Sequence, residues 1–578
     1  MVGQIFPEGD DGRDQAGGLR RRMDADQQGI QKGPRHGSKH TRQPGFPDRL
    51  FADISIEPPA LDEFQADKKM GKISKKIRPF APRAKVSARP LPEDYQEGLS
   101  KLFPNWMVTR PLSSNLPSPL TMILIALALV SAILSPILAG NMMLALVFVA
   151  GVFVIIAGAA LLKWPILGLA GLPIVSLVVR YTLGTGSQTG INVTAMLVLL
   201  LTGTWLLEML VHDRQIRLLP FRPITASLLL IVVALVSFGL GQFNWFPTNS
   251  APITAQVGGL MIFVLSVCAF LVYAHQVKSI DELRWITWVF LVSGFLFLLL
   301  RNFRFTRGYV RQFFVLEASQ GSMFFIWLVS LAAGQLLINK KLHPAGRILL
   351  GGLILLFFYQ NMGIGRAWAS GWLPVLVSLM VIVILYRPRL GIAIAALGVI
   401  IVALTPGLLS GLMSEGDNSY SIITRFEAWR ILAEIIKVSP LLGVGMANYY
   451  WYTSMFRILG YQIQFNSHNN YIDIIAQTGL VGVTIFIWFL WEAGRLGWRT
   501  LGKAPEGFAK AYVIAAIGGL AGTAFAGLLG DWIIPFVYNV GLNGYRMSVF
   551  AWVFLGGLLA VAKLVLPLDK KELLPTAG

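Results

Sequence analysis

Long apolar runs recur through the chain after residue 116, and they constrain its fold more than any other feature. We count about 14 such segments, most of them at least 18 residues long, which is the length an α-helix needs to cross a bilayer. Their approximate ranges are 118–139, 141–162, 164–181, 190–211, 223–241, 255–275, 285–301, 322–339, 346–362, 367–386, 390–413, 472–494, 508–530 and 548–567. The third, seventh and ninth are short, so the pattern predicts an all-α polytopic membrane bundle of about 12–14 transmembrane helices.

The composition agrees with a membrane protein and excludes other classes. Of the 578 residues, 55% are hydrophobic and only 14% are charged, and the mean hydropathy is +0.62. A soluble globular chain carries about a quarter charged residues, so a soluble enzyme is excluded, as is a disordered chain. The single cysteine, Cys268, excludes an internal disulfide and a cysteine-based metal site.

Residues 1–116 have a different composition. They hold 20 Lys and Arg against 15 Asp and Glu, are rich in Gly, Pro, Gln and Asp, and contain no long apolar run. We expect a disordered, basic cytoplasmic tail without a cleavable signal peptide. The basic run 68–78 could contact anionic lipid, but a solvated tail is the favoured interpretation. Nucleic-acid binding is not expected, because no aromatic residues interleave that run.

The distribution of Lys and Arg between loops predicts the orientation. With the N-terminus in the cytoplasm, 18 of these residues lie on the cytoplasmic side and 11 on the outer side, so both termini are expected inside. The chain then divides into a cytoplasmic tail, a transmembrane bundle, one long extracytoplasmic loop, C-terminal transmembrane helices and a short cytoplasmic tail. Their ranges are 1–116, 117–412, 413–471, 472–568 and 569–578.

Ten of the 11 outer basic residues are arginine, which distinguishes them from the mixed cytoplasmic set. A topology signal accepts lysine equally, so this bias favours a planar anion ligand such as phosphate. Arginines that snorkel to the membrane surface are the alternative. Four of them recur at steps of three and four residues and would share a helix face: Arg301, Arg304, Arg307 and Arg311.

The long outer loop contains a predicted amphipathic helix. Thr424 and Glu427 have the spacing of a capping box, so we expect the helix to begin there and to end before Pro440. Arg425 would then lie in the first turn, where an anion at the helix N-terminus would explain it. The expected apolar face is Phe426, Trp429, Ala433 and Ile436, and the expected charged face is Glu427, Arg430, Glu434 and Lys437. Residues 440–445, Pro-Leu-Leu-Gly-Val-Gly, predict a sharp turn that permits close backbone approach.

His468 closes the same loop and is the only one of six histidines predicted on the outer side. It lies in a polar cluster, 466–470, just before the twelfth apolar segment. An imidazole at a helix N-terminus tends to stay neutral, which suits a general base. A hydrogen-bonded structural histidine is the alternative interpretation.

Three motifs together resemble the superfamily of bacterial O-antigen ligases and O-antigen polymerases. Residues 467–471, Ser-His-Asn-Asn-Tyr, followed by Gly-Leu-Val-Gly at 479–482, resemble the family's His-Asn motif and glycine-containing helix. Residues 424–429, Thr-Arg-Phe-Glu-Ala-Trp, with the turn 440–445, resemble its arginine-to-tryptophan helix. Arg366 resembles the arginine at the outer end of the preceding span, although Gly365 replaces the usual serine. The resemblance covers roughly residues 190–500.

The resemblance implies an inverting, metal-independent glycosyl transfer in the bacterial inner (cytoplasmic) membrane, on its outer side. The donor would be a glycan on polyprenyl (undecaprenyl) diphosphate, and the acceptor a hydroxyl of a glycan, a lipid or a protein, in cell-surface polysaccharide or lipopolysaccharide biosynthesis. No cofactor, metal or nucleic acid is expected, and membrane lipid is an expected partner. Arginines can stabilise a leaving diphosphate, and an imidazole can accept the proton of a hydroxyl.

We therefore predict His468 as the base and Arg366 and Arg425 as diphosphate ligands. The four arginines of 301–311 are candidates for a further phosphate contact. Asp473 or Glu427 could orient His468 or an arginine, and Asn469 of the His-Asn motif would support the site.

The sequence is also compatible with three other functions. A polymerase of the same superfamily would use the same donor, and only its product distinguishes it from a ligase. A transporter of lipid-linked glycan is a different class, but transporters usually carry ionisable residues at mid-membrane and paired broken helices. A non-catalytic assembly scaffold is the third alternative.

Overall fold

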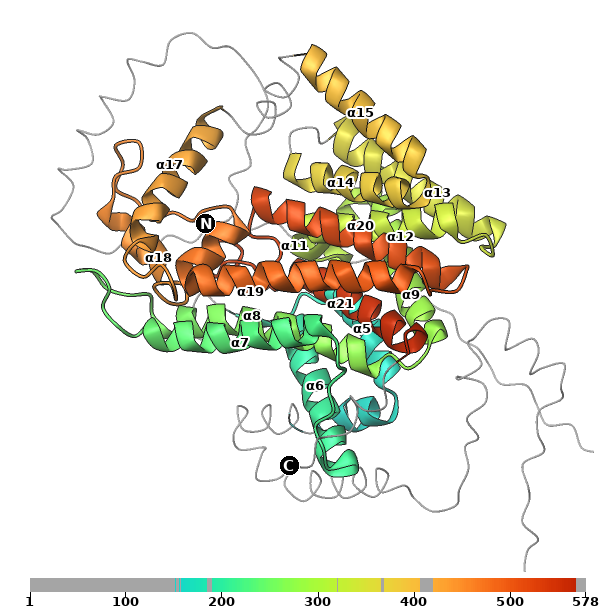
Figure 1. The fold of residues 1–578 in the computed structure, drawn as a ribbon, viewed down its shortest axis with the longest axis horizontal. Coiled ribbons are helices and arrows are strands. Elements are labelled where there is room, and N and C mark those ends of the chain that lie inside the picture. Colours follow the sequence, from blue (N-terminus) through green and yellow to red (C-terminus); the bar gives the residue numbers. More distant parts are fainter. Residues whose placement is uncertain are drawn as a thin grey trace, which may run out of the picture. The chain divides into compact units, whose positions relative to one another are not determined.

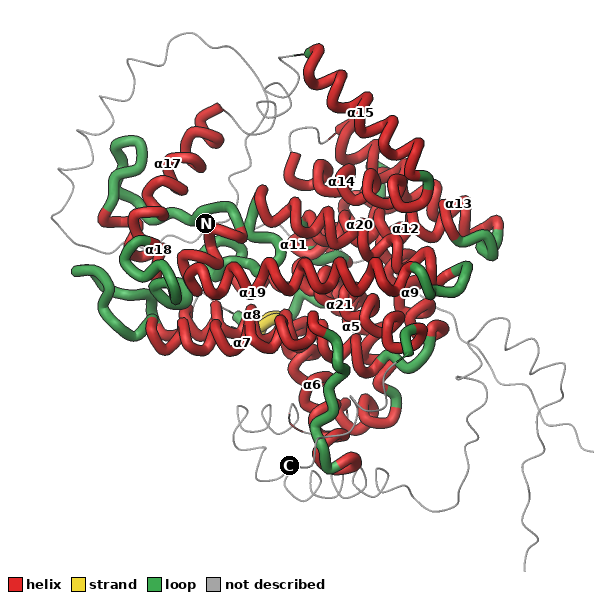
Figure 2. Tube along the Cα trace, viewed as in Figure 1, coloured by secondary structure: helices red, strands yellow, loops and turns green. Residues whose placement is uncertain are grey.

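The computed structural model describes residues 151, 155, 157–184, 190–319, 321–364, 369–405 and 419–567. In these ranges the chain is almost wholly helical, with one small two-stranded sheet (Figures 1 and 2). The predicted tail 1–116, the first apolar segment, Arg366 and the C-terminal tail 569–578 lie outside the described residues.

The helices in the first half of the described chain follow the predicted segments closely. They are α5 (Pro165–Val178), α6 (Val193–Glu208), α7 (Arg222–Leu240), α8 (Ile253–Gln276), α9 (Ile280–Asn302), α10 (Arg307–Phe313), α11 (Leu316–Ser319), α12 (Ser322–Ile338) and α13 (Pro344–Phe358). Strands β1 (Thr182–Leu183) and β2 (Ile191–Asn192) pair antiparallel between α5 and α6. Short π-helical turns extend α6 and α13 over Met209–Asp213 and Tyr359–Ile364.

The second half contains α14 (Ala369–Tyr386), α15 (Pro388–Leu404), α17 (Ser419–Ile436), α18 (Asn448–Tyr452), α19 (Asn470–Leu501), α20 (Phe508–Leu529) and α21 (Gly541–Val565). A short 3-10 turn, Thr453–Met455, follows α18. Over all the described ranges, 8 helices are long and apolar enough to cross a membrane, and four shorter apolar helices accompany them. Each predicted segment from the third to the fourteenth therefore corresponds to a helix, which confirms the polytopic helical fold.

Helices α21 and α12 form the centre of the bundle, although α21 is the last helix described. Both are predominantly apolar, and nearly every side chain of α12 and most of those of α21 are buried. α21 packs along α8, and α20 packs between α12 and α14. A Cβ on Gly556 would lie 2.5 Å from the carbonyl oxygen of Phe270, so glycine permits the close approach of α21 to α8.

Loops that were predicted on one side of the membrane meet at one end of the bundle. At the predicted outer end, Asn448 donates to the carbonyl of Gly241, and Asn470 donates to that of Ile534. At the opposite end, Lys563 donates to the carbonyl of Val277, and Arg222 pairs with Glu492. The contacts therefore separate the two sets of loops as the topology requires.

Helix α19 is interrupted at Gly479, whose φ is 69° and ψ is −170°. The turn 440–445 fills this break. The amides of Val444 and Gly445 donate to the carbonyls of Ala476 and Gln477 at 3.0 and 3.2 Å. The amides of Leu480 and Val481 donate to the carbonyls of residues 440 and 441 at 2.8 and 3.1 Å. The predicted turn and the glycine of α19 thus form one interlocked unit that fixes the first part of α19 to the outer loop.

Helix α17 corrects two sequence predictions. It begins at Ser419, so Thr424 lies inside the helix rather than at a capping box, and Arg425 is not in its first turn. No Pro or Gly separates 419 from 424, so nothing stops the helix from starting earlier. The buried side chains are Ala428, Ile431, Leu432 and Ile435, whereas the predicted apolar-face residue Phe426 is 63% exposed. The charged face is as predicted, and the helix ends before Pro440 as expected.

Candidate active site

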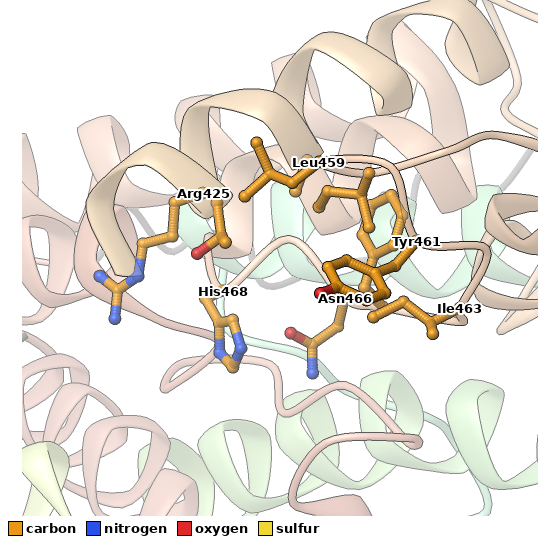
Figure 3. Close-up of a pocket in the computed structure, with 10 residues that line it drawn as sticks. Arg425, Leu459, Tyr461, Ile463, Asn466 and His468 are labelled. Carbon is orange, nitrogen blue, oxygen red and sulfur yellow. The ribbon is translucent and has the colours of Figure 1, made fainter. Parts of the chain in front are cut away.

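His468 and Arg425 line one pocket of about 240 Å³ at the predicted outer end of the bundle. Arg425 comes from α17, and His468 comes from the loop that leads into α19, so the pocket joins two segments that are 43 residues apart. Figure 3 shows the imidazole of His468 between Arg425 and Asn466. The remaining lining residues are Thr424, Ala428, Ile458, Leu459, Tyr461, Ile463 and Phe465. The pocket therefore combines a cation, an imidazole and an apolar wall.

Trp429 connects the two sides of this pocket. Its indole Nε1 donates to the carbonyl oxygen of Ser467 at 2.8 Å. Trp429 follows Arg425 by four residues, so both project from the same side of α17. One hydrogen bond thus fixes the residue before His468 relative to the helix that carries Arg425. The predicted arginine-to-tryptophan helix has a positioning role here that its sequence pattern did not reveal.

The backbone of His468 is in the left-handed conformation, with a φ of 49°. For a residue other than glycine this costs of the order of 1 kcal/mol, and it persists only where the surroundings hold it. Asn469 provides part of that support, because its side-chain oxygen accepts from the amides of Tyr471 and Ile472 and caps α19. Its side-chain amide donates to the carbonyl of Leu528 at 3.2 Å. The side chain of His468 itself is exposed to the pocket.

Asp473 lies in the first turn of α19 and contacts the loop that carries His468. It is only 1% exposed. It accepts hydrogen bonds from the hydroxyl of Ser467 at 2.6 Å and from the hydroxyl of Tyr449. Burial, followed by the negative charge of Asp473, raises the pKa of Tyr449 well above its usual value, so Tyr449 stays protonated and donates. Asp473 therefore contacts the neighbour of His468, and through Ser467 it positions the loop.

Asp531 is a second buried carboxylate beneath the pocket, and sequence reasoning missed it. It lies between α20 and α21 and accepts from the amide of Phe536 at 2.8 Å and from the side chain of Asn539 at 2.6 Å. Burial raises the pKa of Asp531, while these two hydrogen bonds and the charge of His468 act in the opposite direction. The electrostatic effect of His468 identifies Asp531 as a carboxylate whose field reaches the imidazole. No local pattern indicates this, because 63 residues separate the two.

Glu427 forms its contacts on the outer surface of α17. Its carboxylate pairs with Arg430 through two hydrogen bonds of 2.7 and 3.0 Å. This pairing lowers the pKa of Glu427, chiefly through the hydrogen bond from Arg430. The arginine that Glu427 orients is therefore Arg430, which does not line the pocket.

The arginines of 301–311 gather around a different pocket. Arg301, Arg307 and Arg311 line a cavity of about 300 Å³ with Gln360, whereas Arg304 is not among its lining residues. This cavity shares no lining residue with the His468 pocket. The structure thus brings His468 and Arg425 together and places the other described candidate arginines elsewhere.

Residues 366–487 match the family model described as O-antigen ligase, a range that includes Arg425, Asp473 and His468. No curated protein matches the chain. The match agrees with the motifs of the sequence and with the described apolar helices. The described helices are those of a multi-pass membrane protein, and its residues 366–487 are similar to the O-antigen ligase family.

Proposed function

We propose that the protein transfers a glycan from polyprenyl diphosphate to a hydroxyl acceptor, with His468 as the base. The observation that carries the proposal is the shared pocket of His468 and Arg425. The acceptor oxygen attacks the anomeric carbon of the glycan while His468 accepts the hydroxyl proton. The bond from that carbon to the diphosphate oxygen breaks, and the polyprenyl diphosphate leaves with both bonding electrons. A single displacement of this kind inverts the anomeric centre.

The residues of the pocket fit these roles. A guanidinium group binds phosphate oxygens through charge-assisted hydrogen bonds, so Arg425 stabilises the charge that develops on the leaving group. In the proposal Arg366, which lies outside the described residues, is the second diphosphate ligand. Arg301, Arg304, Arg307 and Arg311 remain candidates for a further phosphate contact. The proposed chemistry assigns charge stabilisation to arginines and needs no cofactor.

Asn466 adds a polar contact for a sugar. Its side-chain oxygen is buried, lines the same pocket and has no hydrogen-bond partner within the described ranges. A buried acceptor without a donor is costly, and a sugar hydroxyl would satisfy it. Tyr461, which is 65% exposed, provides an apolar ring face beside it.

The proposal places the pocket on the outer side of the bacterial inner membrane, with both termini in the cytoplasm. The excess of Lys and Arg in the opposite loops supports this orientation. The wider role is the biosynthesis of cell-surface polysaccharide such as lipopolysaccharide.

The test uses purified full-length protein, a polyprenyl-diphosphate glycan and a glycan acceptor. His468→Ala and Arg425→Ala should each reduce transfer at least a hundredfold, as removal of a base or of a charge-stabilising group commonly does. His343→Ala and Arg430→Ala are matched controls, because His343 caps α13 at the opposite end and Arg430 pairs with Glu427 on the surface. Normal transfer by His468→Ala would remove this residue from catalysis.

The product separates the two activities of the superfamily. Longer glycans on the lipid carrier indicate a polymerase, whereas glycan on another acceptor indicates a ligase. Movement of the lipid-linked glycan across vesicles without bond formation would indicate transport and overturn the proposal.

A further inference from the structure

A second basic pocket lies where α21 begins, outside the range that matches the family model. Its volume is about 310 Å³, and three arginines line it: Arg180, Arg311 and Arg546. Thr182, Asn543 and Glu317 supply its other polar side chains. It shares no lining residue with the His468 pocket, and none of its residues lies in 366–487. It shares Arg311 with the neighbouring cavity of Arg301 and Arg307.

The charge of this pocket is not balanced by the protein. Arg546 is only 2% exposed, and its guanidinium donates to the carbonyl of Val179 and, at 3.0 Å, to that of Tyr181. Arg180 donates to the carbonyl of Phe314 at 3.1 Å. None of the three arginines forms an ion pair within the part of the chain that the structure describes. Three guanidinium groups against the one carboxylate of Glu317 leave two positive charges.

An apolar groove of about 230 Å³ begins beside this pocket. Residues of α6 and α8 line it, with Ile191 and Leu542 at its end. Its exposed members include Leu199, Ile253 and Val257, which are 41%, 53% and 43% exposed.

The groove and the pocket are joined by shared backbone. Leu542 lines the groove and the next residue, Asn543, lines the pocket. The paired strands β1 and β2 contribute Thr182 to the pocket and Ile191 to the groove. The side chain of Asn192 donates to the carbonyl of Leu542 at 2.5 Å and holds the hairpin against α21. The apolar groove and the doubly positive pocket therefore lie against the same hairpin and the same end of α21.

We propose that this surface binds a second lipid, whose head group is a phosphate monoester and whose chain occupies the groove. A phosphate monoester carries about −1.5 to −2 charges at pH 7, which matches two uncompensated positive charges, whereas a phosphodiester carries about −1. The apolar groove selects an amphiphile over a free anion. The site is separate from the His468 pocket, and its occupancy does not depend on His468.

The test measures lipid retention by native mass spectrometry of the full-length protein purified in detergent. Phosphatidic acid supplies a monoester, phosphatidylglycerol a diester and phosphatidylcholine a zwitterion. We expect retention to decrease in that order. Arg180→Gln should weaken the binding of phosphatidic acid about tenfold, which is the order of one hydrogen bond to a charged group. Val257→Trp should weaken it similarly by filling the groove.

Two controls define the site. Arg457→Gln removes an exposed arginine that lines neither pocket nor groove, and it should retain phosphatidic acid normally. His468→Ala should also retain it, even though the proposed transfer is lost, so the two proposals fail independently. The melting temperature of each variant checks its fold.

Three results would overturn the proposal. Phosphatidylglycerol retained as well as phosphatidic acid would exclude a monoester site. Normal binding by Val257→Trp, or displacement of phosphatidic acid by equimolar inorganic phosphate, would indicate an anion site without a lipid chain. Loss of binding in His468→Ala would place the lipid in the other pocket.

Discussion

Replacing Gly479 by alanine tests the interlock between α19 and the outer loop. The φ of 69° and ψ of −170° at this residue lie in a region that is almost restricted to glycine. Alanine there costs about 1–3 kcal/mol in backbone strain alone. Its Cβ would also lie 2.2 Å from the carbonyl carbon and oxygen of Leu441, which are backbone atoms without freedom to turn away.

The backbone must therefore separate, and two hydrogen bonds break with it. These are the amides of Leu480 and Val481 donating to the carbonyls of 440 and 441. At about 0.5–1.5 kcal/mol net for each bond, the combined loss of unfolding free energy is about 2–6 kcal/mol. The first part of α19 carries the His468 loop, so glycan transfer should fall as well.

The unfolding free energy can be measured by steric trapping in lipid bicelles. Gly239→Ala is the matched control, because it lies in α7, which packs along α19, and an added Cβ there meets nothing within 4 Å. The control should stay within about 0.5 kcal/mol of the wild type. Equal stability of Gly479→Ala and Gly239→Ala would refute the interlock as a source of stability.

Two further predictions concern the support of the pocket. Trp429→Phe keeps an aromatic ring but removes the indole N–H that donates to the buried carbonyl of Ser467. In steady-state transfer assays kcat should fall about tenfold with little change in KM. An unchanged kcat would contradict the positioning role. Asp531 has a raised pKa in the folded state, so its contribution to stability is present below the unfolded value near 3.8 and is lost as pH rises through the folded value. The melting temperature of the wild type should therefore decrease as the pH rises above 3.8, and Asp531→Asn should show a smaller decrease. Parallel profiles would be inconsistent with a raised pKa.

The helices were predictable because their signal is local. A run of apolar residues long enough to cross a bilayer can be recognised from the sequence alone. Helix α7 accordingly begins and ends within one residue of its expected range, 223–241. The start of α17 was not predictable in this way. The spacing of Thr424 and Glu427 satisfies a capping box, but the residues before Thr424 can also be helical. The buried face of α17 also differs from the predicted one, because the outer loop packs against Ile431 and Leu432 while Ala433 is exposed.

The site was predictable only in part. Histidine and arginine could be chosen by residue type and side of the membrane, but their common pocket depends on closure of a long loop. The bond from Trp429 to Ser467 spans 38 residues, and two membrane helices, α19 and α20, separate Asp531 from the loop along the chain. Such contacts leave no periodic trace in the sequence, because tertiary packing alone selects them.

Unfavourable backbone and burial features are concentrated at the His468 loop, and they favour this loop as the reactive part of the protein. His468 holds a left-handed backbone, and two carboxylates, Asp473 and Asp531, are buried beneath it without a described ion pair. One oxygen of Asp473 also lacks any hydrogen-bond partner among the described residues. Each feature lowers stability, and a fold retains such features mainly where they shape chemistry. The interaction of His468 with Asp531 favours the charged forms of both groups, and a protonated imidazole is the form that arises once a base has accepted a proton.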